Sequence, residues 1–146
     1  MQHIPWDGDM AEFPEPLRRY LRPGHVFDSS SSAEATVYYS DIGQGCYIKK
    51  ARHSVLRNEA AMTRYFHDKG LSAAVLHYDQ DHDGNDWLAT ACLPGDDCTA
   101  SLYVREPERL SAVLGRRLRM LHEQDPTGCP VSNRTKDYLA TVKRSH

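Results

Sequence analysis

Residues 46–60 of this chain read CYIKKARHSVLRNEA, a run of strand-forming residues followed closely by the start of a helix. The first five residues have the composition of a strand. The stretch from Val55 to Lys69 predicts an amphipathic helix, because Val55, Met62 and Phe66 fall within about 40° of one another on a helical wheel. The segment therefore predicts a strand that leads almost directly into a helix.

A glutamate interrupts the apolar side of this predicted helix. Glu59 lies on the same side of the wheel as Val55, Met62 and Phe66, within about 60° of each of them. A carboxylate that faces a core costs several kcal/mol unless a cation and hydrogen bonds compensate it. The preceding strand offers Lys49, so we predict a Lys49–Glu59 ion pair. The alternative is a slightly rotated helix with both side chains solvated, as most charged residues are.

Two hairpins are predicted on either side of this helix. The runs Thr36–Ser40 and Cys46–Lys50 are joined by a short connection that contains two glycines. The runs Ala74–Tyr78 and Trp87–Leu93 flank a polar turn with Asp-Gly at residues 83–84. Short glycine-containing connections between strand-forming runs are typical of antiparallel hairpins.

The chain becomes helical after Pro94-Gly95. A short helix is also expected earlier, at Glu15–Leu21, and a long one is predicted from Pro107 to His122, with Pro126 beyond its end. The long helix carries an apolar stripe formed by Leu110, Val113, Leu114, Leu118 and Leu121. The order of strand, hairpin, helix, hairpin and helices predicts an α+β fold with a mainly antiparallel sheet.

Composition argues against several classes of partner. The chain has 18 Lys and Arg against 20 Asp and Glu, and a formal net charge of −2, so neither nucleic acid nor an acidic membrane surface is an expected partner. It has no apolar run of about 20 residues and no signal-peptide pattern, so we expect a cytoplasmic protein. Its four cysteines form no C-x-x-C pair, and we expect them to be reduced thiols.

No metal site is expected from the sequence. Asp79, Asp81, Asp83 and Gly84 match the opening of a calcium loop, but Thr90 stands where the bidentate glutamate belongs, and the flanks are strand-forming. We therefore interpret this segment as an acidic hairpin tip. The eight histidines have no metal-ligand spacing.

The serine run at residues 29–32 leaves two interpretations open. Hydroxyls and backbone N–H groups in a tight turn can cradle phosphate, whereas a serine-rich segment can also be a plain flexible loop. Neither G-x-x-x-x-G-K-[ST] nor G-x-G-x-x-G is present, which excludes a P-loop.

In this order the predicted elements resemble the nucleotide-binding lobe of the protein-kinase-like fold, and more narrowly the 3'-phosphotransferase branch of the aminoglycoside phosphotransferase family. The resemblance is carried by Ala35-Thr-Val-Tyr38, Tyr47-Ile-Lys49, Leu56-Arg-Asn-Glu-Ala60, Trp87 to Gly95, and Leu118-Arg-Met-Leu-His122 followed by Cys129-Pro130. It implies an N-lobe at residues 1–93, with a five-stranded, mainly antiparallel sheet and one helix. A hinge at 94–98 and the first C-lobe helices at 99–146 are expected to follow.

The resemblance also implies roles for individual residues in binding ATP. Lys49 matches the lysine that contacts the α- and β-phosphates, and Glu59 matches its ion-pair partner. Tyr47 matches the aromatic residue that stacks on adenine. Thr90 matches the gatekeeper position at the back of the site.

Five further residues are expected around the nucleotide. Ser31, Ser32 and Ala33 fall in the loop that covers the phosphates. The carbonyl of Ala91 and the amide of Leu93 are expected to bond the adenine edge.

The sequence departs from the family pattern where the chemistry is done. It lacks the H-x-D-x-x-x-x-N catalytic loop and the D-x-G that follows it, and His77-Tyr-Asp79 has no Asn five residues beyond the Asp. The catalytic Asp and the Mg²⁺ ligands are thus missing, and we expect no phosphoryl transfer by this chain alone.

Two functions are therefore carried forward. The first is the N-terminal nucleotide-binding portion of an ATP-dependent kinase, whose aminoglycoside-like substrate would require the C-lobe. The alternative is a naturally short, non-catalytic relative that binds nucleotide or protein. In both cases we expect the apolar face of the helix at Leu110–Leu121 to be exposed and to favour self-association.

Overall fold

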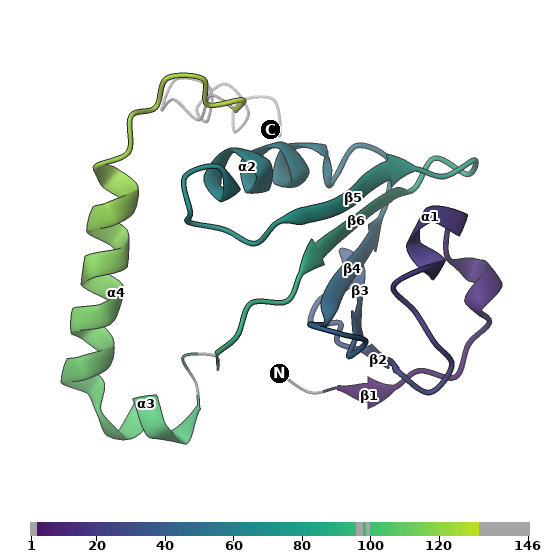
Figure 1. Ribbon diagram of the computed structural model, residues 1–146, viewed down its shortest axis with the longest axis horizontal. Coiled ribbons are helices and arrows are strands. Elements are labelled where there is room, and N and C mark those ends of the chain that lie inside the picture. Colours follow the sequence, from purple (N-terminus) through teal and green to yellow (C-terminus); the bar gives the residue numbers. More distant parts are fainter. Residues whose placement is uncertain (1–2, 96–97, 99, 132–146) are drawn as a thin grey trace, which may run out of the picture.

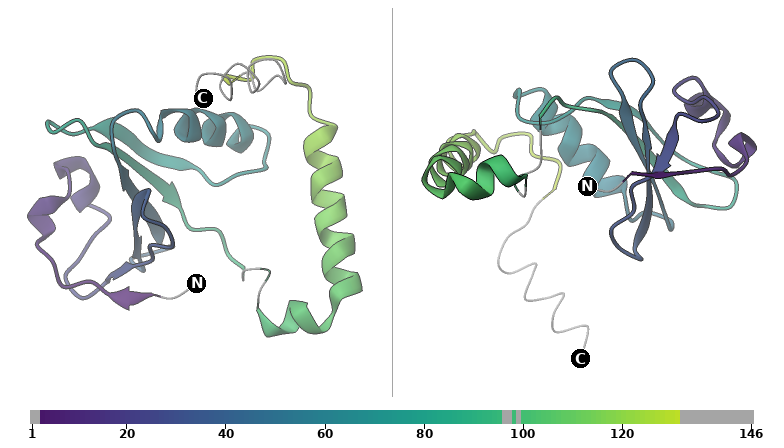
Figure 2. Two further views of the ribbon diagram at one scale, coloured as in Figure 1. Left: turned by 180° about the vertical axis from the view of Figure 1, so that it is seen from behind. Right: turned by 90° about the horizontal axis from the view of Figure 1, so that it is seen from below.

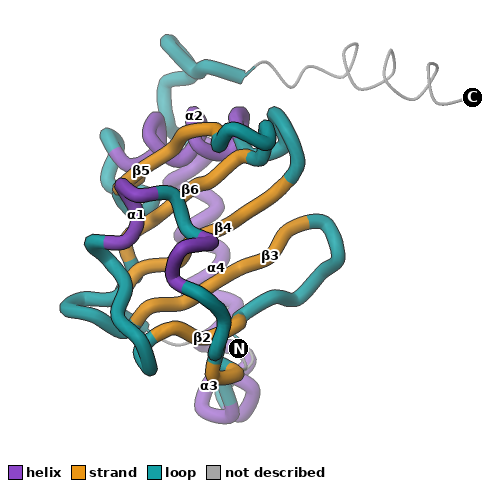
Figure 3. Tube along the Cα trace, turned by 90° about the vertical axis from the view of Figure 1, so that its right-hand side faces the viewer, coloured by secondary structure: helices purple, strands orange, loops and turns teal. Residues whose placement is uncertain are grey.

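The computed structural model describes residues 3–95, 98 and 100–131. Its main element is an antiparallel sheet with the strand order β1-β2-β3-β4-β6-β5, whose strands Figure 3 shows side by side. The strands are β1 (Ile4–Pro5), β2 (Val26–Asp28), β3 (Ala35–Ser40), β4 (Cys46–Ala51), β5 (Val75–Gln80) and β6 (Asp86–Ala91). Both predicted hairpins are confirmed, as β3–β4 and β5–β6.

The sheet has six strands, so the expected number of five is wrong. The additional strand is β1, which pairs with β2 through Ile4 opposite Asp28 and Pro5 opposite Phe27. A two-residue strand has no alternation that a sequence pattern could reveal. Pro5 has no backbone N–H, and it is tolerated here because β1 is an edge strand.

Helices lie on both faces of the sheet (Figures 1 and 2). The helix α2 (Arg57–His67) covers one face, and the N-terminal segment with the 3-10 helix η1 (Met10–Glu12) and α1 (Glu15–Arg18) covers the other. The helices α3 (Ser101–Arg105) and α4 (Pro107–His122) follow the sheet. The predicted start and end of α4 are confirmed, whereas α1 is shorter than predicted and α3 was not predicted.

Strand alternation places a separate apolar cluster on each face. The cluster under the N-terminal segment contains Phe13, Leu17, Leu21, Val26, Tyr38, Cys46, Ile48, Trp87 and Ala89. The cluster under α2 contains Ala51, Leu56, Ala60 and Leu88. Because alternate residues of β4 and β6 point to opposite faces, Lys49 shares a face with Ala51, and Lys50 shares the other face with Ile48.

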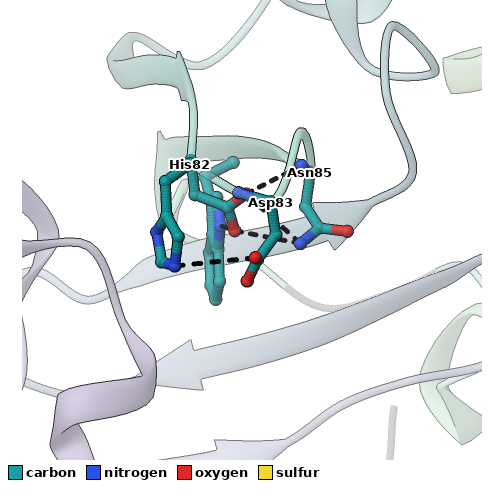
Figure 4. A network of polar contacts seen from close by, with 5 residues as sticks. His82, Asp83 and Asn85 are labelled. Carbon is teal, nitrogen blue, oxygen red and sulfur yellow. Dashed lines mark hydrogen bonds and ion pairs between the residues drawn. The ribbon is translucent and has the colours of Figure 1, made fainter.

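The β5–β6 hairpin ends in a turn organised by one carboxylate (Figure 4). Asp81 accepts hydrogen bonds from the backbone N–H groups of Asp83 at 3.0 Å and Asn85 at 2.8 Å, and from Trp87 Nε1 at 2.8 Å. Burial raises the pKa of Asp81, but these hydrogen bonds outweigh it and hold the pKa at about 2. The hydrogen-bond donors to this carboxylate therefore all come from the hairpin itself. No group of three or more metal-ligating side chains lies among the described residues.

The helix α4 stands beside the sheet (Figure 1), and part of its apolar stripe is exposed. Val113, Leu114, Leu118 and Leu121 have exposed fractions of 41%, 44%, 55% and 39%. The loop after α4 returns to α2, where the carbonyl of Asp125 accepts hydrogen bonds from Tyr65 Oη at 2.8 Å and Lys69 Nζ at 3.2 Å. Within the described ranges, no helix is long and apolar enough to cross a bilayer.

Candidate functional site

A cavity of about 530 Å³ lies between α2, the neighbouring face of the sheet and the serine-rich loop that joins β2 to β3. The strands β3, β4 and β6 and the helix α2 contribute to its wall, together with the loops before β3, before α2 and after α2. The lining residues are Ser29, Ser31, Ser32, Glu34, Ala35, Val37, Tyr47, Lys49, Val55, Leu56, Glu59, Thr63, Ser72, Ala73 and Thr90.

An ion pair crosses this cavity from the sheet to the helix. Lys49 Nζ of β4 donates a hydrogen bond to Glu59 Oε1 of α2 at 2.5 Å. The register of the sheet sets Lys49 opposite Leu88, and Leu88 packs against Leu56 at the start of α2. The predicted pair is therefore present, and it joins the two walls of the cavity.

The premise that Glu59 faces a core is wrong. The side chains of Lys49 and Glu59 are 36% and 41% exposed, and the buried residue of α2 is Ala60. Val55 is 55% exposed and precedes the helix, which begins at Arg57, so it does not belong to the wheel from which the stripe was predicted. The partners meet at an accessible cavity wall, where the desolvation cost of a charge is modest.

The serine-rich loop forms the cover of the cavity. Its turn is held by Ser30, whose N–H donates to Asp28 Oδ1 at 2.7 Å and whose Oγ accepts from the Val37 N–H at 3.0 Å. The hydrogen bonds from Ser30 keep the pKa of Asp28 below its ordinary value. Ser31 and Ser32 line the cavity as expected, whereas Ala33 is not among the lining residues.

Ser29 belongs to the serine run that was considered as a phosphate cradle, but it was not among the individual residues expected around the nucleotide. It is 3% exposed, it lines the cavity, and its Oγ has no hydrogen-bond partner among the described residues. A buried hydroxyl without a partner costs free energy that a bound acceptor would recover. Nothing in the sequence distinguishes Ser29 from the serines that follow it.

Tyr47 contributes an aromatic wall to the cavity, and other aromatic rings pack next to it. Its ring lies 5.1 Å from that of Tyr39, which in turn lies 4.4 Å from the ring of His3. Burial raises the pKa of Tyr47, and the phenol is neutral at physiological pH. The neighbouring rings restrict the orientation of Tyr47 at the cavity.

The strand β6 and the residues that follow it supply only one of the three contacts expected from them. Thr90 lines the cavity next to Tyr47, its register partner on β4. Ala91 is not among the lining residues, and Leu93 is 59% exposed and lines a smaller cavity that includes Arg117 and Leu121 of α4. The structure thus gathers six of the nine expected residues: Ser31, Ser32, Tyr47, Lys49, Glu59 and Thr90.

Some of the unpredicted lining residues had a signal in the sequence. Val37 lies opposite Lys49 in the β3–β4 pair, and Ala35 lies on the same face of β3, so the hairpin alternation predicts both. Thr63 follows Glu59 by one helical turn and shares its side of α2. Ser72 and Ala73 come from the loop after α2, where no periodicity applies.

The side chains that line the cavity are chemically suited to a nucleoside triphosphate. Lys49 provides a cation for phosphate oxygens, and Ser29 provides a buried hydroxyl that needs a partner. Tyr47 provides a ring face on which a planar base can stack. The site thus combines groups that are able to bind phosphate with a ring on which a planar base could stack.

Comparisons with known proteins agree with this architecture. The chain is similar to the "Probable aminoglycoside 3'-phosphotransferase" of Lactococcus lactis subsp. lactis (strain IL1403), with 36% identity over 137 residues. The match covers 94% of this chain and 52% of the relative, so the chain spans about half the length of that protein.

The fold is shared with a solved protein of similar name. The crystal structure of an aminoglycoside-3'-phosphotransferase of type VIII superposes with a TM-score of 0.64 at 21% identity, over 81% of this chain and 44% of the other. This likeness confirms the expected kinase-like N-lobe. Residues 29–145 match the phosphotransferase enzyme family known as APH. The chain therefore belongs to the APH phosphotransferase family.

Proposed function

We propose that this chain is the nucleotide-binding portion of an ATP-dependent kinase that phosphorylates a hydroxyl group of an aminoglycoside. One observation carries the proposal: the Lys49–Glu59 pair lies in a cavity covered by the serine-rich loop. A lysine held by a glutamate of the neighbouring helix is the arrangement that orients the α- and β-phosphates in kinase-like enzymes.

Each wall of the cavity has a part in this proposal. Lys49 contacts the α- and β-phosphates, and Glu59 holds the ammonium group in place. The hydroxyls of Ser29, Ser31 and Ser32 bind phosphate oxygens from above. Tyr47 stacks on adenine, and Thr90 limits the depth of the base pocket.

The proposed portion binds nucleotide without completing the reaction. Phosphoryl transfer needs Mg²⁺ and a residue that orients the attacking hydroxyl. The sequence lacks the H-x-D-x-x-x-x-N loop and the following D-x-G that carry these groups in the family. In the proposed organisation, residues 1–93 form the nucleotide lobe, 94–98 the hinge, and 99–146 the first part of a helical lobe.

The acceptor is inferred from the related proteins, both of which are named as aminoglycoside 3'-phosphotransferases. Phosphorylation of an aminoglycoside hydroxyl places negative charge on a cationic antibiotic, so the whole protein would confer resistance. The proposed location is the cytoplasm, where ATP is available.

Titration of the chain with ATP, ADP and AMP in the presence of Mg²⁺, followed by calorimetry, tests nucleotide binding. We expect ATP and ADP to bind with similar affinity and AMP to bind at least about tenfold more weakly, because the loop and Lys49 hold phosphates. With ATP and an aminoglycoside, no ADP should be released. Failure of ATP to bind at millimolar concentration, or equal affinities for ATP and AMP, would contradict the proposal.

The acceptor requires a separate experiment with the whole coding region. The reading frame beyond the codon for His146 would be examined for H-x-D-x-x-x-x-N followed by D-x-G. If both are in frame, expression of the whole protein in a susceptible bacterium should raise the inhibitory concentration of aminoglycosides. A stop codon directly after His146 would instead favour the short, non-catalytic alternative.

A further inference from the structure

We propose that Asp86 is a positioning residue for nucleotide binding: it holds the start of α2 against the sheet and thereby places Glu59 within reach of Lys49. The inference rests on the proposed function and assigns a role to a residue outside the expected site. Its evidence is the burial of Asp86, its hydrogen bonds and its place in the strand register.

Asp86 is a fully buried carboxylate at the beginning of β6. It is 0% exposed, and each of its oxygens has a partner. Oδ2 accepts a hydrogen bond from the backbone N–H of Leu56 at 2.8 Å, and Oδ1 accepts one from Gln80 Nε2 at 2.8 Å. Burying an ionised group is costly, so its presence here requires compensating contacts of this kind.

The hydrogen bond from the Leu56 N–H to Asp86 provides a cap at the N-terminus of α2. Leu56 directly precedes the helix, and no side chain there caps it. Its carbonyl accepts the hydrogen bond from the Ala60 N–H at 2.8 Å, so Leu56 is part of the first helical turn. Asp86 therefore caps α2 from another strand, and its negative charge lies at the positive end of the helix dipole.

The connection between β4 and α2 also depends on this carboxylate. Ser54 has a φ of 62°, in the left-handed region that residues with a side chain rarely adopt. Burial raises the pKa of Asp86, but the hydrogen bonds to its carboxylate, from Gln80 first and then from the Leu56 N–H, outweigh burial and lower it. Asp86 thus stays ionised and bonds the end of this strained connection at Leu56.

The register of the sheet relates Asp86 directly to the ion pair. Asp86 lies opposite Ala51, and Leu88, on the same face of β6, lies opposite Lys49. Glu59 follows Leu56 by about one turn of α2. The position of Lys49 is therefore set by the β4–β6 register. The position of Glu59 is set by the hydrogen bond between Leu56 and Asp86, which holds α2 against β6. Leu56 itself lines the cavity.

A buried carboxylate could instead contribute to stability alone, and a matched control separates the two roles. Asp81 lies in the same hairpin and also accepts several hydrogen bonds, including one from Trp87 Nε1 at 2.8 Å. None of the hydrogen bonds that Asp81 accepts from the described residues comes from α2. Loss of Asp81 should therefore lower stability without moving Glu59.

The test measures the ATP dissociation constant for Asp86→Ala, Asp86→Asn and Asp81→Asn, each alone and in combination with Glu59→Gln. We expect Asp86→Ala to weaken ATP binding by about tenfold when Glu59 is present and by less than about twofold when it is replaced. Asp86→Asn keeps an oxygen for the Leu56 N–H and should give an intermediate loss. Asp81→Asn should stay within about twofold of the wild type.

Two results would overturn the inference. One is wild-type affinity in folded Asp86→Ala or Asp86→Asn, and the other is an equal loss with and without Glu59. If the wild type binds no ATP, the proposed function fails, and crystal structures of the wild type, Asp86→Ala and Asp81→Asn still decide the positioning role. An unchanged Nζ–Oε1 contact in Asp86→Ala would then contradict it, whereas a separation beyond about 4 Å in that variant alone would support it.

Discussion

Lys49 and Lys50 are neighbours in β4, yet they serve opposite faces of the sheet. Lys49 Nζ contacts Glu59 Oε1 in the cavity under α2, whereas Lys50 Nζ lies 5.0 Å from the ring centroid of Trp87, under the N-terminal segment. The alternation of a strand thus gives two adjacent lysines different surroundings. It also provides a matched control for any experiment on the site.

Removal of Lys49 should barely alter stability. The pair is more than one-third exposed on both sides, and exposed ion pairs contribute about 0.2–1 kcal/mol. Lys49→Met is expected to lower the free energy of unfolding by less than about 1 kcal/mol in urea titration. A loss of several kcal/mol would show that the pair is a structural support instead of a binding group.

Tyr47 should contribute to affinity through its ring and not through its hydroxyl. Tyr47→Phe keeps the ring face and the packing on Tyr39, and is expected to bind ATP as the wild type does. Tyr47→Ala removes both the ring face and its packing on Tyr39. This variant should lower the affinity for ATP about three- to tenfold, which is the range of an aromatic stacking contact. Equal affinities of the Phe and Ala variants in calorimetry would argue against stacking on this ring.

The hairpin carboxylate Asp81 makes stability depend on pH. Its pKa is about 2 in the folded chain against the ordinary value of 3.8, so its contribution is complete above about pH 4 and is lost as the pH falls toward 2. Urea unfolding between pH 5 and pH 2 should show this loss in the wild type. Asp81→Asn should reduce the slope of the unfolding free energy against pH by the equivalent of about one bound proton. Part of the pH dependence should remain, because the pKa values of Asp28 and Asp86 are also lowered.

An unchanged pH dependence in Asp81→Asn would contradict the assignment of this hairpin network. The experiment is independent of nucleotide binding, because Asp81 is not among the residues that line the candidate site.

The exposed face of α4 should associate with other copies of the chain. Leu118 is 55% exposed and lies between Leu114 and Leu121, which are also exposed. Leu118→Glu is expected to reduce self-association in sedimentation velocity and to reduce binding of a hydrophobic dye. Arg116→Ala, on the same helix, serves as a control that leaves the apolar face intact. A monomeric wild type that binds no dye would refute this expectation.

Local signals in the sequence predicted much of the fold. The β3–β4 hairpin follows from two strand-forming runs and the glycines between them, and Gly43 and Gly45 have φ values of 63° and 79°. The end of α2 follows from Gly70, whose φ is 70°, and the Leu71 N–H donates to the Phe66 carbonyl at 2.9 Å. Such features depend on a few consecutive residues, so a single sequence reveals them.

Features that depend on tertiary contacts were not predictable in the same way. Asp86 follows a polar turn and resembles any other turn carboxylate, and only the packing of α2 across the sheet shows that it is buried beneath Leu56. The prediction that Glu59 faces a core was wrong because the residue of α2 that is buried against the sheet is Ala60, whereas Glu59 faces the accessible cavity. Ser29 is distinguished from its neighbours by burial alone.

The most direct test of the central claim compares ATP binding by the wild type, Lys49→Met and Lys50→Met in one calorimetric experiment. We predict that Lys49→Met lowers the affinity for ATP by at least about tenfold, because it removes a charge-assisted contact to phosphate. The affinity of Lys50→Met should stay within about twofold of that of the wild type. Equal affinities of all three proteins, or a larger loss in Lys50→Met, would show that the cavity at the Lys49–Glu59 pair is not the nucleotide site.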